Sequence, residues 1–280
     1  MAQSEGFMNK EYKVSVLLPC RDGESTLRVT IESILNQTIK TYIAVADDAS
    51  IDNTPKILKE QSKTGRVYTI RYPRRESRNY AKIPVLLNML LDVIPQADFY
   101  MISGDDCFFP PEYLKKLILL MHNDDVDLAS GCHDVKNYKH LTLPSGSGRL
   151  VTASLFKKIT PLPNSIGWES WMIYKAQSLG RKVSVYPVEF EHKREYSFGS
   201  TWTFGYSAYV NGIPFIFTLF RAMKSLFTGV HSPVNAVSIP LGQLEYILKR
   251  AEKLDCAPFV NSMYKQRINQ YIIRVLYNRN

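Results

Sequence analysis

The hydrophobic positions near the start of the chain form short apolar runs separated by amphipathic stretches. The run Val14–Pro19 is too apolar for a half-exposed strand, so we expect it in the middle of a sheet. Apolar residues recur with helical spacing from about residue 26 to 37, and a second apolar run covers Tyr42–Ala46. Capping residues and an early proline in 52–55 indicate another helix start. This alternation predicts an α/β fold with a mostly parallel sheet flanked by helices.

Two acidic pairs follow predicted strands. Asp47 and Asp48 come directly after the second apolar run. Asp105 and Asp106 come after Phe99–Ile102, which is apolar enough to be a buried strand. Because ligands of such sheets bind at the carboxyl ends of the strands, we expect both pairs at that edge.

The Gly104-Asp105-Asp106 segment has two interpretations. Adjacent carboxylates repel each other, and each needs water or a partner. A divalent cation bound to a diphosphate is a suitable partner, because Mg²⁺ and Mn²⁺ prefer hard oxygen ligands. The alternative is a solvated turn, since these residue types are common in turns.

The last 70 residues show a different pattern. Ile213–Phe220 is strongly apolar but too short to span a bilayer. We expect helices at Leu241–Leu254 and at about 260–277, the second with an apolar side beside basic residues. Such a helix could pack equally well on a membrane surface, on the core of the same chain or on a second subunit.

Composition narrows the classes of protein. The net charge of +9 favours anionic partners, such as a sugar nucleotide, lipid phosphates or an anionic glycan. The basic residues are dispersed and form no nucleic-acid-binding motif, so we expect no nucleic acid partner. Four distant cysteines without a C-x-x-C pattern indicate neither a zinc site nor a disulfide framework. With a polar start to the chain, this favours the cytoplasm, either free or at the inner face of the membrane.

Several motifs in register resemble one enzyme family. The strand Val14–Pro19, the phrase Ser33–Thr38 (SILNQT) and the phrase Asp47–Thr54 (DDASIDNT) match the opening of family 2 glycosyltransferases in order and spacing. The resemblance extends over about residues 12–197. It implies an inverting, metal-dependent hexosyltransferase with the GT-A fold in residues 1–210. Residues 211–280 would then be a helical extension that lies on the acceptor side and packs on the core or a membrane surface.

The resemblance also implies roles for the residues at the strand ends. The nucleotide-sugar donor would bind at the end of the first strand, and either Asp47 or Asp48 would accept from an N–H of the base; helix capping is the alternative role for these two. Asp106 would be a ligand of Mg²⁺ or Mn²⁺, with Asp105 facing the ribose or a metal-bound water. The family's first acidic position falls on Ser103 or Gly104 here, which removes one expected ligand. The residues implied to line the nucleotide pocket are Pro19, Arg21 and Asp22.

Two further segments resemble parts of the family's donor site. Gly148 lies in a loop of small residues that resembles the loop beneath the donor sugar, where the backbone approaches the ligand. His192 would complete the metal shell, and Lys193 and Arg194 would neutralise the departing diphosphate. The basic segment Arg71–Asn79 has two interpretations, a phosphate contact or a solvated charge run.

The catalytic base is the point where the chain departs most from the family. The family places a Glu-Asp pair at a helix start, and here Ser170 stands at the Asp position. Glu169 is the nearest remaining carboxylate and the candidate base, with Trp168 as a platform for a sugar ring or as core. A catalytically weak or inactive nucleotide-sugar-binding relative is the alternative. A nucleotidyltransferase would need a glycine-rich loop that Cys20–Gly23 does not supply. The acceptor would be a hydroxyl of a glycan or of a lipid-linked molecule, and the oligomeric state stays open.

Overall fold

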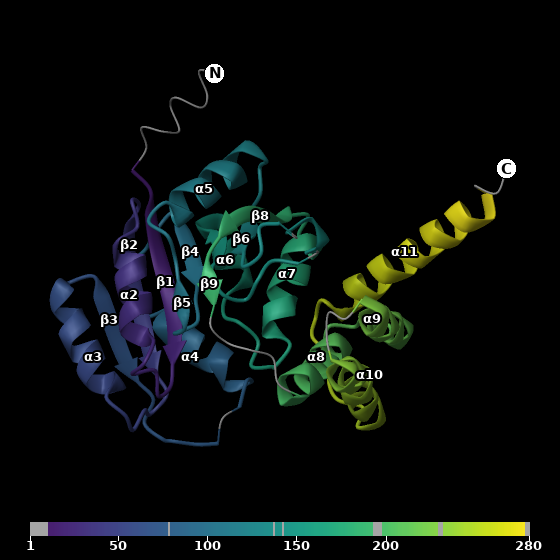
Figure 1. The fold of residues 1–280 in the computed structure, drawn as a ribbon, viewed down its shortest axis with the longest axis horizontal. Coiled ribbons are helices and arrows are strands. Elements are labelled where there is room, and N and C mark those ends of the chain that lie inside the picture. Colours follow the sequence, from purple (N-terminus) through teal and green to yellow (C-terminus); the bar gives the residue numbers. More distant parts are fainter. Residues whose placement is uncertain are drawn as a thin grey trace. The chain divides into compact units, whose positions relative to one another are not determined.

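The computed structural model describes residues 11–77, 79–136, 138–141, 143–192, 198–228 and 232–277 (Figure 1). Its strands are β1 (Lys13–Cys20), β2 (Lys40–Asp47), β3 (Val67–Arg71), β4 (Phe99–Ile102), β5 (Cys107–Phe108), β6 (Leu128–Cys132), β7 (Arg149–Thr152), β8 (Val183–Glu189) and β9 (Glu191–His192). Its α-helices are α2 (Leu27–Leu35), α3 (Thr54–Gln61), α4 (Lys82–Leu90), α5 (Tyr113–Asn123), α6 (Ala153–Ile159), α7 (Trp168–Ser178), α8 (Phe198–Val210), α9 (Phe215–Thr228), α10 (Pro233–Leu248) and α11 (Ala257–Tyr277).

A seven-stranded sheet organises the first part of the chain. Its order is β3-β2-β1-β4-β7-β6-β8, and β7 runs antiparallel to both of its neighbours while the other pairings are parallel. The prediction of a mostly parallel sheet flanked by helices is therefore confirmed. The apolar run at residues 14–19 lies inside β1, which has a strand on either side, as its burial pattern requires.

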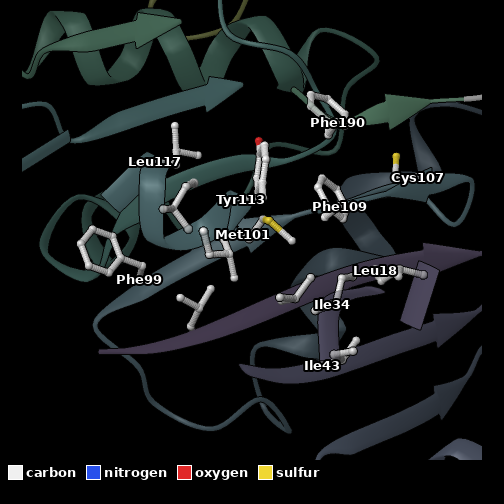
Figure 2. Close-up of a cluster of buried hydrophobic side chains, with 14 of the residues drawn as sticks. Leu18, Ile34, Ile43, Phe99, Met101, Cys107, Phe109, Tyr113, Leu117 and Phe190 are labelled. Atoms are coloured by element: carbon white, nitrogen blue, oxygen red, sulfur yellow. The ribbon is translucent and has the colours of Figure 1, made fainter. Parts of the chain in front are cut away.

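The core of this sheet is built from alternate residues of its strands. Val14, Val16 and Leu18 of β1 belong to one buried cluster with Ile34 of α2 and Leu117 of α5 (Figure 2). The helical spacing of α2 and α5 places their apolar side chains on the face that meets the sheet. Burial of each such side chain stabilises the fold by roughly 1.5–3 kcal/mol.

Tyr113 joins β6 to β7 through its hydroxyl group. The fully buried hydroxyl donates to the carbonyl oxygen of Gly148 at 2.7 Å and accepts from the backbone N–H of Gly131 at 3.1 Å. Gly148 has a φ of +68°, and a Cβ there would lie 2.6 Å from the tyrosine oxygen. A side chain at Gly131 would lie 2.0 Å from the carbonyl oxygen of Val188. The hydrogen bonds of Tyr113 therefore require glycine at 148, and the strand that it bonds requires glycine at 131.

The chain forms two compact units. The first contains the described parts of residues 1–162 and 180–194, and the second contains those of residues 163–179 and 195–280. In the second unit α7 contacts the segment that precedes α11, where Trp171 Nε1 donates to Asp255 Oδ1 at 2.6 Å and Lys175 pairs with the same carboxylate. The division at residue 210 into a transferase domain and an extension stays a prediction, because these units group residues 163–179 with the later helices.

The helices of the second unit correct part of the sequence-based expectation. A helix at Leu241–Leu254 was expected, whereas α10 begins at Pro233 and ends at Leu248. Ser232 caps its start by accepting from the backbone N–H of Asn235, and the helix continues through Pro240. Helix α11 contains the expected helix at about 260–277, and α8 was not expected from the sequence. Among the described residues, no helix is both long and apolar enough to cross a bilayer.

Replacing Tyr113 by Phe should destabilise the first unit. The change leaves the N–H of Gly131 and the carbonyl of Gly148 buried without this partner, so we expect the free energy of unfolding to fall by about 1–3 kcal/mol. Because all three tryptophans of the chain lie in the second unit, amide hydrogen exchange in β6 and β7 is a better measurement than tryptophan fluorescence.

Tyr80→Phe is the matched control, since the side chain of Tyr80 is exposed. It should leave exchange in β6 and β7 unchanged. Equal protection of these strands in Tyr113→Phe and in the parent protein would contradict the bridging role.

Candidate active site

The candidate site lies at the carboxyl edge of the sheet. The last residues of β1, β2 and β3 are in register there: Cys20 pairs with Asp47, and Asp47 pairs with Arg71. The loops that follow β1 and β2 are also bonded to each other, because the Asp22 N–H donates to Ser50 Oγ at 2.8 Å. The Asp48 N–H donates to the carbonyl oxygen of Cys20, also at 2.8 Å. Parallel strands thus hold the chemistry-bearing loops together at one edge.

The two carboxylates that end β2 are buried and paired with cations. Asp47 accepts from the Ser50 N–H at 2.9 Å and forms an ion pair with Arg71 at 2.5 Å. Asp48 forms ion pairs with Arg21 at 3.2 Å and with Lys82 at 2.6 Å. Charge-assisted contacts of this kind compensate for the loss of water around the carboxylates.

Lys82 is a buried cation at the start of α4. Burial alone would lower the pKa of Lys82, but the hydrogen bond and the charge of Asp48 outweigh it, so the pKa is raised and the ammonium stays charged. The ammonium also lies 3.8 Å from the ring centroid of Tyr72. The second partner of the ammonium is Glu76 at 3.3 Å.

The loop after β1 is held in an unusual backbone conformation. Asp22 has a φ of +52°, and Ala49 in the facing loop has a φ of +51°. Both are non-glycine residues in the left-handed region, which costs about 1–3 kcal/mol each and is enriched at functional sites. Arg75 contacts both loops: its two terminal nitrogens bond both carboxylate oxygens of Asp22, at 3.0 and 2.7 Å, and one of them donates to the carbonyl of Ala49. Pro19 is half-buried at the same strand end.

Three cations of this site were missed in the sequence. Arg71 and Arg75 were part of a segment read as a phosphate contact or a solvated charge run, and Lys82 was not singled out. In the structure all three meet carboxylates of the first two loops. The sequence signal for Arg71 was its position at the end of a short strand, which places it at the same edge as Asp47.

The carboxylates of the Gly104-Asp105-Asp106 turn have different neighbours. Asp105 is buried beside the thiol of Cys20, and burial together with Asp105 raises the pKa of that thiol. Asp106 instead meets His192, with 3.4 Å between Oδ1 and Nε2. Thr30 of α2 fixes the turn, since its hydroxyl donates to the carbonyl oxygens of Asp105 and Cys107. One carboxylate therefore lies by the end of β1 and the other by β9.

A short antiparallel pairing brings the candidate metal ligands together. Strands β5 and β9 pair with Cys107 opposite His192, which places the histidine next to the acidic turn although 86 residues separate it from Asp106. One donor atom from each of Asp106, Cys107 and His192 lies within 4.8 Å of the others. A carboxylate oxygen and an imidazole nitrogen suit Mn²⁺, whereas the thiol is a soft donor that Mn²⁺ and Mg²⁺ do not favour. The residues present therefore fit a divalent cation.

The small-residue loop that contains Gly148 lies against the acidic turn. The backbone N–H of Gly104 donates to Ser147 Oγ at 3.2 Å. Arg149, buried and also missed in the sequence, donates to the carbonyl oxygens of Pro144 and Ser145 and so fixes the loop from inside. In the structure Gly148 is required for structural reasons, because its φ is positive and Tyr113 leaves no room for a side chain. Its contact with a sugar stays a prediction.

The remaining predicted site residues lie elsewhere. Lys193 and Arg194 fall outside the described residues. Glu169 is exposed in the first turn of α7, in the second unit. Trp168 is only 3% exposed and Trp171 is 6% exposed, which favours the core role for both rings. The hydroxyl of Ser170, at the family's Asp position, lies 3.4 Å from that of Ser207 in α8. The roles of Trp168 and Glu169 stay predictions.

Comparison with known proteins agrees with this geometry. The profile of the family described as "Glycosyl transferase family 2" matches residues 15–185, which is more than half of the chain. A Bacillus subtilis (strain 168) protein named "Putative glycosyltransferase EpsE" is 33% identical over 119 residues, a match that spans 40% of this chain and 40% of that protein.

Solved structures show the same fold at low sequence identity. The mannosyltransferase PcManGT from Pyrobaculum calidifontis, in complex with GDP-Man and Mn²⁺, has a TM-score of 0.60 at 13% identity, over 100% of this chain and 94% of that one. S. aureus TarS 1–349 in complex with UDP-GlcNAc has a TM-score of 0.53 at 16% identity, over 91% and 92%. Glucosyl-3-phosphoglycerate synthase from Mycobacterium tuberculosis, in complex with Mn²⁺ and UDP-glucose, also has a TM-score of 0.53 at 16% identity, over 72% and 78%.

These structures are glycosyltransferases, and their likeness identifies the sheet of this chain as the GT-A fold. The resemblance found in the sequence motifs is confirmed by the family profile. From its matched residues and its fold, the chain belongs to glycosyl transferase family 2.

Proposed function

We propose that this protein is an inverting glycosyltransferase that moves a hexosyl group from a nucleotide-diphosphate sugar to a hydroxyl group. The observation that carries the proposal is the convergence of the loops after β1 and β2 with the Gly104-Asp105-Asp106 turn at one edge of the sheet. Family membership supports glycosyltransferase activity. The solved structures of similar fold include complexes with GDP-Man, UDP-GlcNAc and UDP-glucose.

The nucleoside part of the donor would bind between the first two loops. Pro19, Arg21 and Asp22 line the end of β1 in this proposal, and Asp47 or Asp48 accepts a hydrogen bond from a ring N–H of the base. An ionised carboxylate has about four acceptor sites, so a carboxylate already paired with a cation can still accept from a base. The pairing with Arg21, Arg71 and Lys82 holds these carboxylates in fixed orientations, which favours discrimination between bases.

The diphosphate part of the donor would lie toward Asp105, Asp106 and His192. In our proposal Asp106 and His192 hold Mn²⁺ or Mg²⁺, and the mixed oxygen and nitrogen donors favour Mn²⁺. When bound, the cation would neutralise charge on the diphosphate leaving group. Asp105 would face the ribose or a metal-bound water, the loop at Gly148 would lie beneath the sugar, and Lys193 and Arg194 would face the departing phosphates.

The chemical step requires a base for the acceptor hydroxyl. We assign this role to Glu169, which would remove the proton as the hydroxyl oxygen attacks the anomeric carbon and the nucleoside diphosphate leaves from the opposite face. Trp168 would take the core role behind this helix start, because the residue is only 3% exposed. A relative that binds the donor without transfer is the alternative, and the replacement of the family's Asp by Ser170 is the observation that favours it.

The acceptor in this proposal is a glycan or a lipid-linked molecule, used in the cytoplasm or at the inner face of the membrane. The product would belong to polysaccharide or glycoconjugate synthesis.

A screen of sugar nucleotides tests the function first. With Mn²⁺ present, we expect one class among UDP-, GDP- and dTDP-sugars to raise the melting temperature, because a ligand at 100 times its Kd stabilises the native state by about 2.7 kcal/mol. Asp106→Asn and His192→Ala should each remove the Mn²⁺-dependent part of the shift, since each deletes one donor to the cation.

Asp92→Asn is the control for this screen, because Asp92 is exposed and lies outside the site. Direct titration of Mn²⁺ in the presence of the nucleoside diphosphate gives a readout that needs no turnover. An Mn²⁺-dependent shift of full size in both ligand variants would contradict the metal assignment.

Recognition of the base is tested without metal. In the absence of divalent cations, Asp47→Ala and Asp48→Ala are compared by calorimetric titration with the nucleoside diphosphate. The base-reading variant should bind more weakly by roughly 1–3 kcal/mol, because its loss leaves the ring N–H of the base without an acceptor. Asp92→Ala should bind as the parent does. If both site variants keep the parent affinity, the base is read elsewhere.

Glu169→Gln tests the chemical step. The amide keeps the shape of the side chain, so donor affinity should be retained while the transfer rate falls by about 10²–10⁴-fold. Glu252→Gln, an exposed glutamate of the same unit, should change neither quantity.

The converse substitution separates a weak enzyme from an inactive binding protein. Ser170→Asp restores the carboxylate that the family carries at this position and should raise the transfer rate if the protein is a weak enzyme. Unchanged turnover in Glu169→Gln would remove this residue from the mechanism. Donor binding without transfer in every variant would support the binding-protein alternative.

A further inference from the structure

Helices α9 and α10 of the second unit reverse the usual pattern of a helix in a water-soluble protein. Their buried residues are small or polar. Thr218, Ala222 and Ser225 are buried in α9, and Ala236, Ser238, Pro240, Gly242 and Gln243 are buried in α10. In a water-soluble helix the buried face normally carries the large apolar side chains.

Most of the large apolar side chains of the two helices are exposed instead. Phe220 and Phe227 of α9 are 59% and 88% exposed, and Leu248 at the end of α10 is 75% exposed. The exposed residues recur at intervals of three and four, so they form one stripe on each helix. These stripes are Ile216, Phe220, Met223 and Phe227 on α9, and Val234, Val237, Leu241, Leu244 and Leu248 on α10.

Close packing through small residues explains how α10 associates with α8 without a large apolar interior. A Cβ on Gly242 of α10 would lie 2.4 Å from the carbonyl oxygen of Trp202 in α8. A Cβ on Gly205 of α8 would lie 2.1 Å from the carbonyl oxygen of Ile239 in α10. The backbones therefore approach closely, a mode of packing that is enriched where helices meet in an apolar solvent.

The charges around these helices are mostly positive. Residues 198–244 contain no Asp or Glu and two cations, Arg221 and Lys224, both exposed on α9. Glu245 of α10 is paired with Lys249, and the next residue, Arg250, is exposed. Over residues 211–280, nine Lys and Arg stand against three Asp and Glu, which places +6 of the chain's net charge of +9 in its last quarter.

The dimensions of the helices exclude a spanning role for the described segments. With 14 and 16 residues, α9 and α10 are about 21 and 24 Å long, whereas the hydrocarbon core of a bilayer is roughly 30 Å thick. A helix with one apolar face and nearby cations lies in the interfacial plane, with the apolar side chains among the acyl chains.

We infer that the exposed stripes of α9 and α10 bind the surface of an anionic lipid membrane. Phe220, Phe227 and Leu248 enter the boundary between headgroups and acyl chains, while Arg221 and Lys224 contact lipid phosphates. A second copy of the chain is the alternative partner for this surface, but the cations of the two copies would then repel each other. An anionic lipid surface complements them. The inference rests on the helices alone and does not depend on the transfer reaction.

Vesicle flotation with the full chain tests the inference. The parent protein should float with phosphatidylcholine vesicles that contain about one third phosphatidylglycerol, and much less with pure phosphatidylcholine. The double variant Phe220→Gln and Phe227→Gln should bind the anionic vesicles at least about tenfold more weakly, because two exposed aromatic side chains no longer enter the bilayer.

Two comparisons control for general effects of the substitutions. Val29→Gln replaces an exposed apolar residue of α2 in the first unit and should leave flotation unchanged. Arg221→Gln and Lys224→Gln should each weaken binding about fivefold to anionic vesicles only, an effect that high salt should remove from the parent protein as well. Circular dichroism of each variant checks that the helices remain folded.

Three results would overturn the inference. The first is failure of the parent protein to float with anionic vesicles, and the second is flotation of the double variant equal to that of the parent. The third is a lipid-free dimer, measured by analytical ultracentrifugation, that the double variant converts to a monomer. That result would assign the stripes to a second copy of the chain.

Discussion

Repulsion between carboxylates at one edge of the sheet is the constraint that the candidate site has to satisfy. Asp47 ends a strand of the first unit, and Asp22, Asp48, Asp105 and Asp106 follow closely after strand ends. Parallel topology makes this unavoidable, because β1, β2 and β4 end at the same edge. The fold meets the constraint by supplying cations from segments distant in sequence: Arg21, Arg71, Arg75 and Lys82. The loop after β3 is therefore as much a part of the site as the acidic motifs.

Much of the first unit was predictable from the sequence, because its signals are local. β1 and β4 are buried on both faces, so their apolar runs stand out without any knowledge of their neighbours. The positions of Asp47 and Asp106 at strand ends follow from the same runs. Lys82 and Arg75 could not be assigned in this way, because their roles depend on partners 34 and 53 residues away. A basic residue in a loop looks the same in sequence whether it faces solvent or a buried carboxylate.

The second unit was less predictable, because its helices break the rules that sequence interpretation uses. The amphipathic pattern assumes that large apolar side chains are buried, and α9 and α10 expose them. The sequence predicted a helix beginning at Leu241, yet α10 begins at Pro233, where the cap Ser232 and a proline in the first turn are favourable. Helix α7, which carries Glu169, adds a further difficulty, since it is close in sequence to the first unit but groups with the helices of the second.

The pairing of charges at the sheet edge has a consequence for the kinetics of ligand capture. Among the described residues of this edge, the cations Arg21, Arg71, Arg75 and Lys82 are balanced by the five aspartates and Glu76, so these strand ends carry no excess positive charge despite the chain's net charge of +9. Long-range attraction of an anionic ligand to this edge would therefore be weak, and its association rate would depend only slightly on ionic strength. Selectivity would arise after encounter, when the ligand exchanges contacts with carboxylates and guanidinium groups that are already paired. The excess positive charge of the chain therefore lies mainly in residues 211–280 and not at the sheet edge.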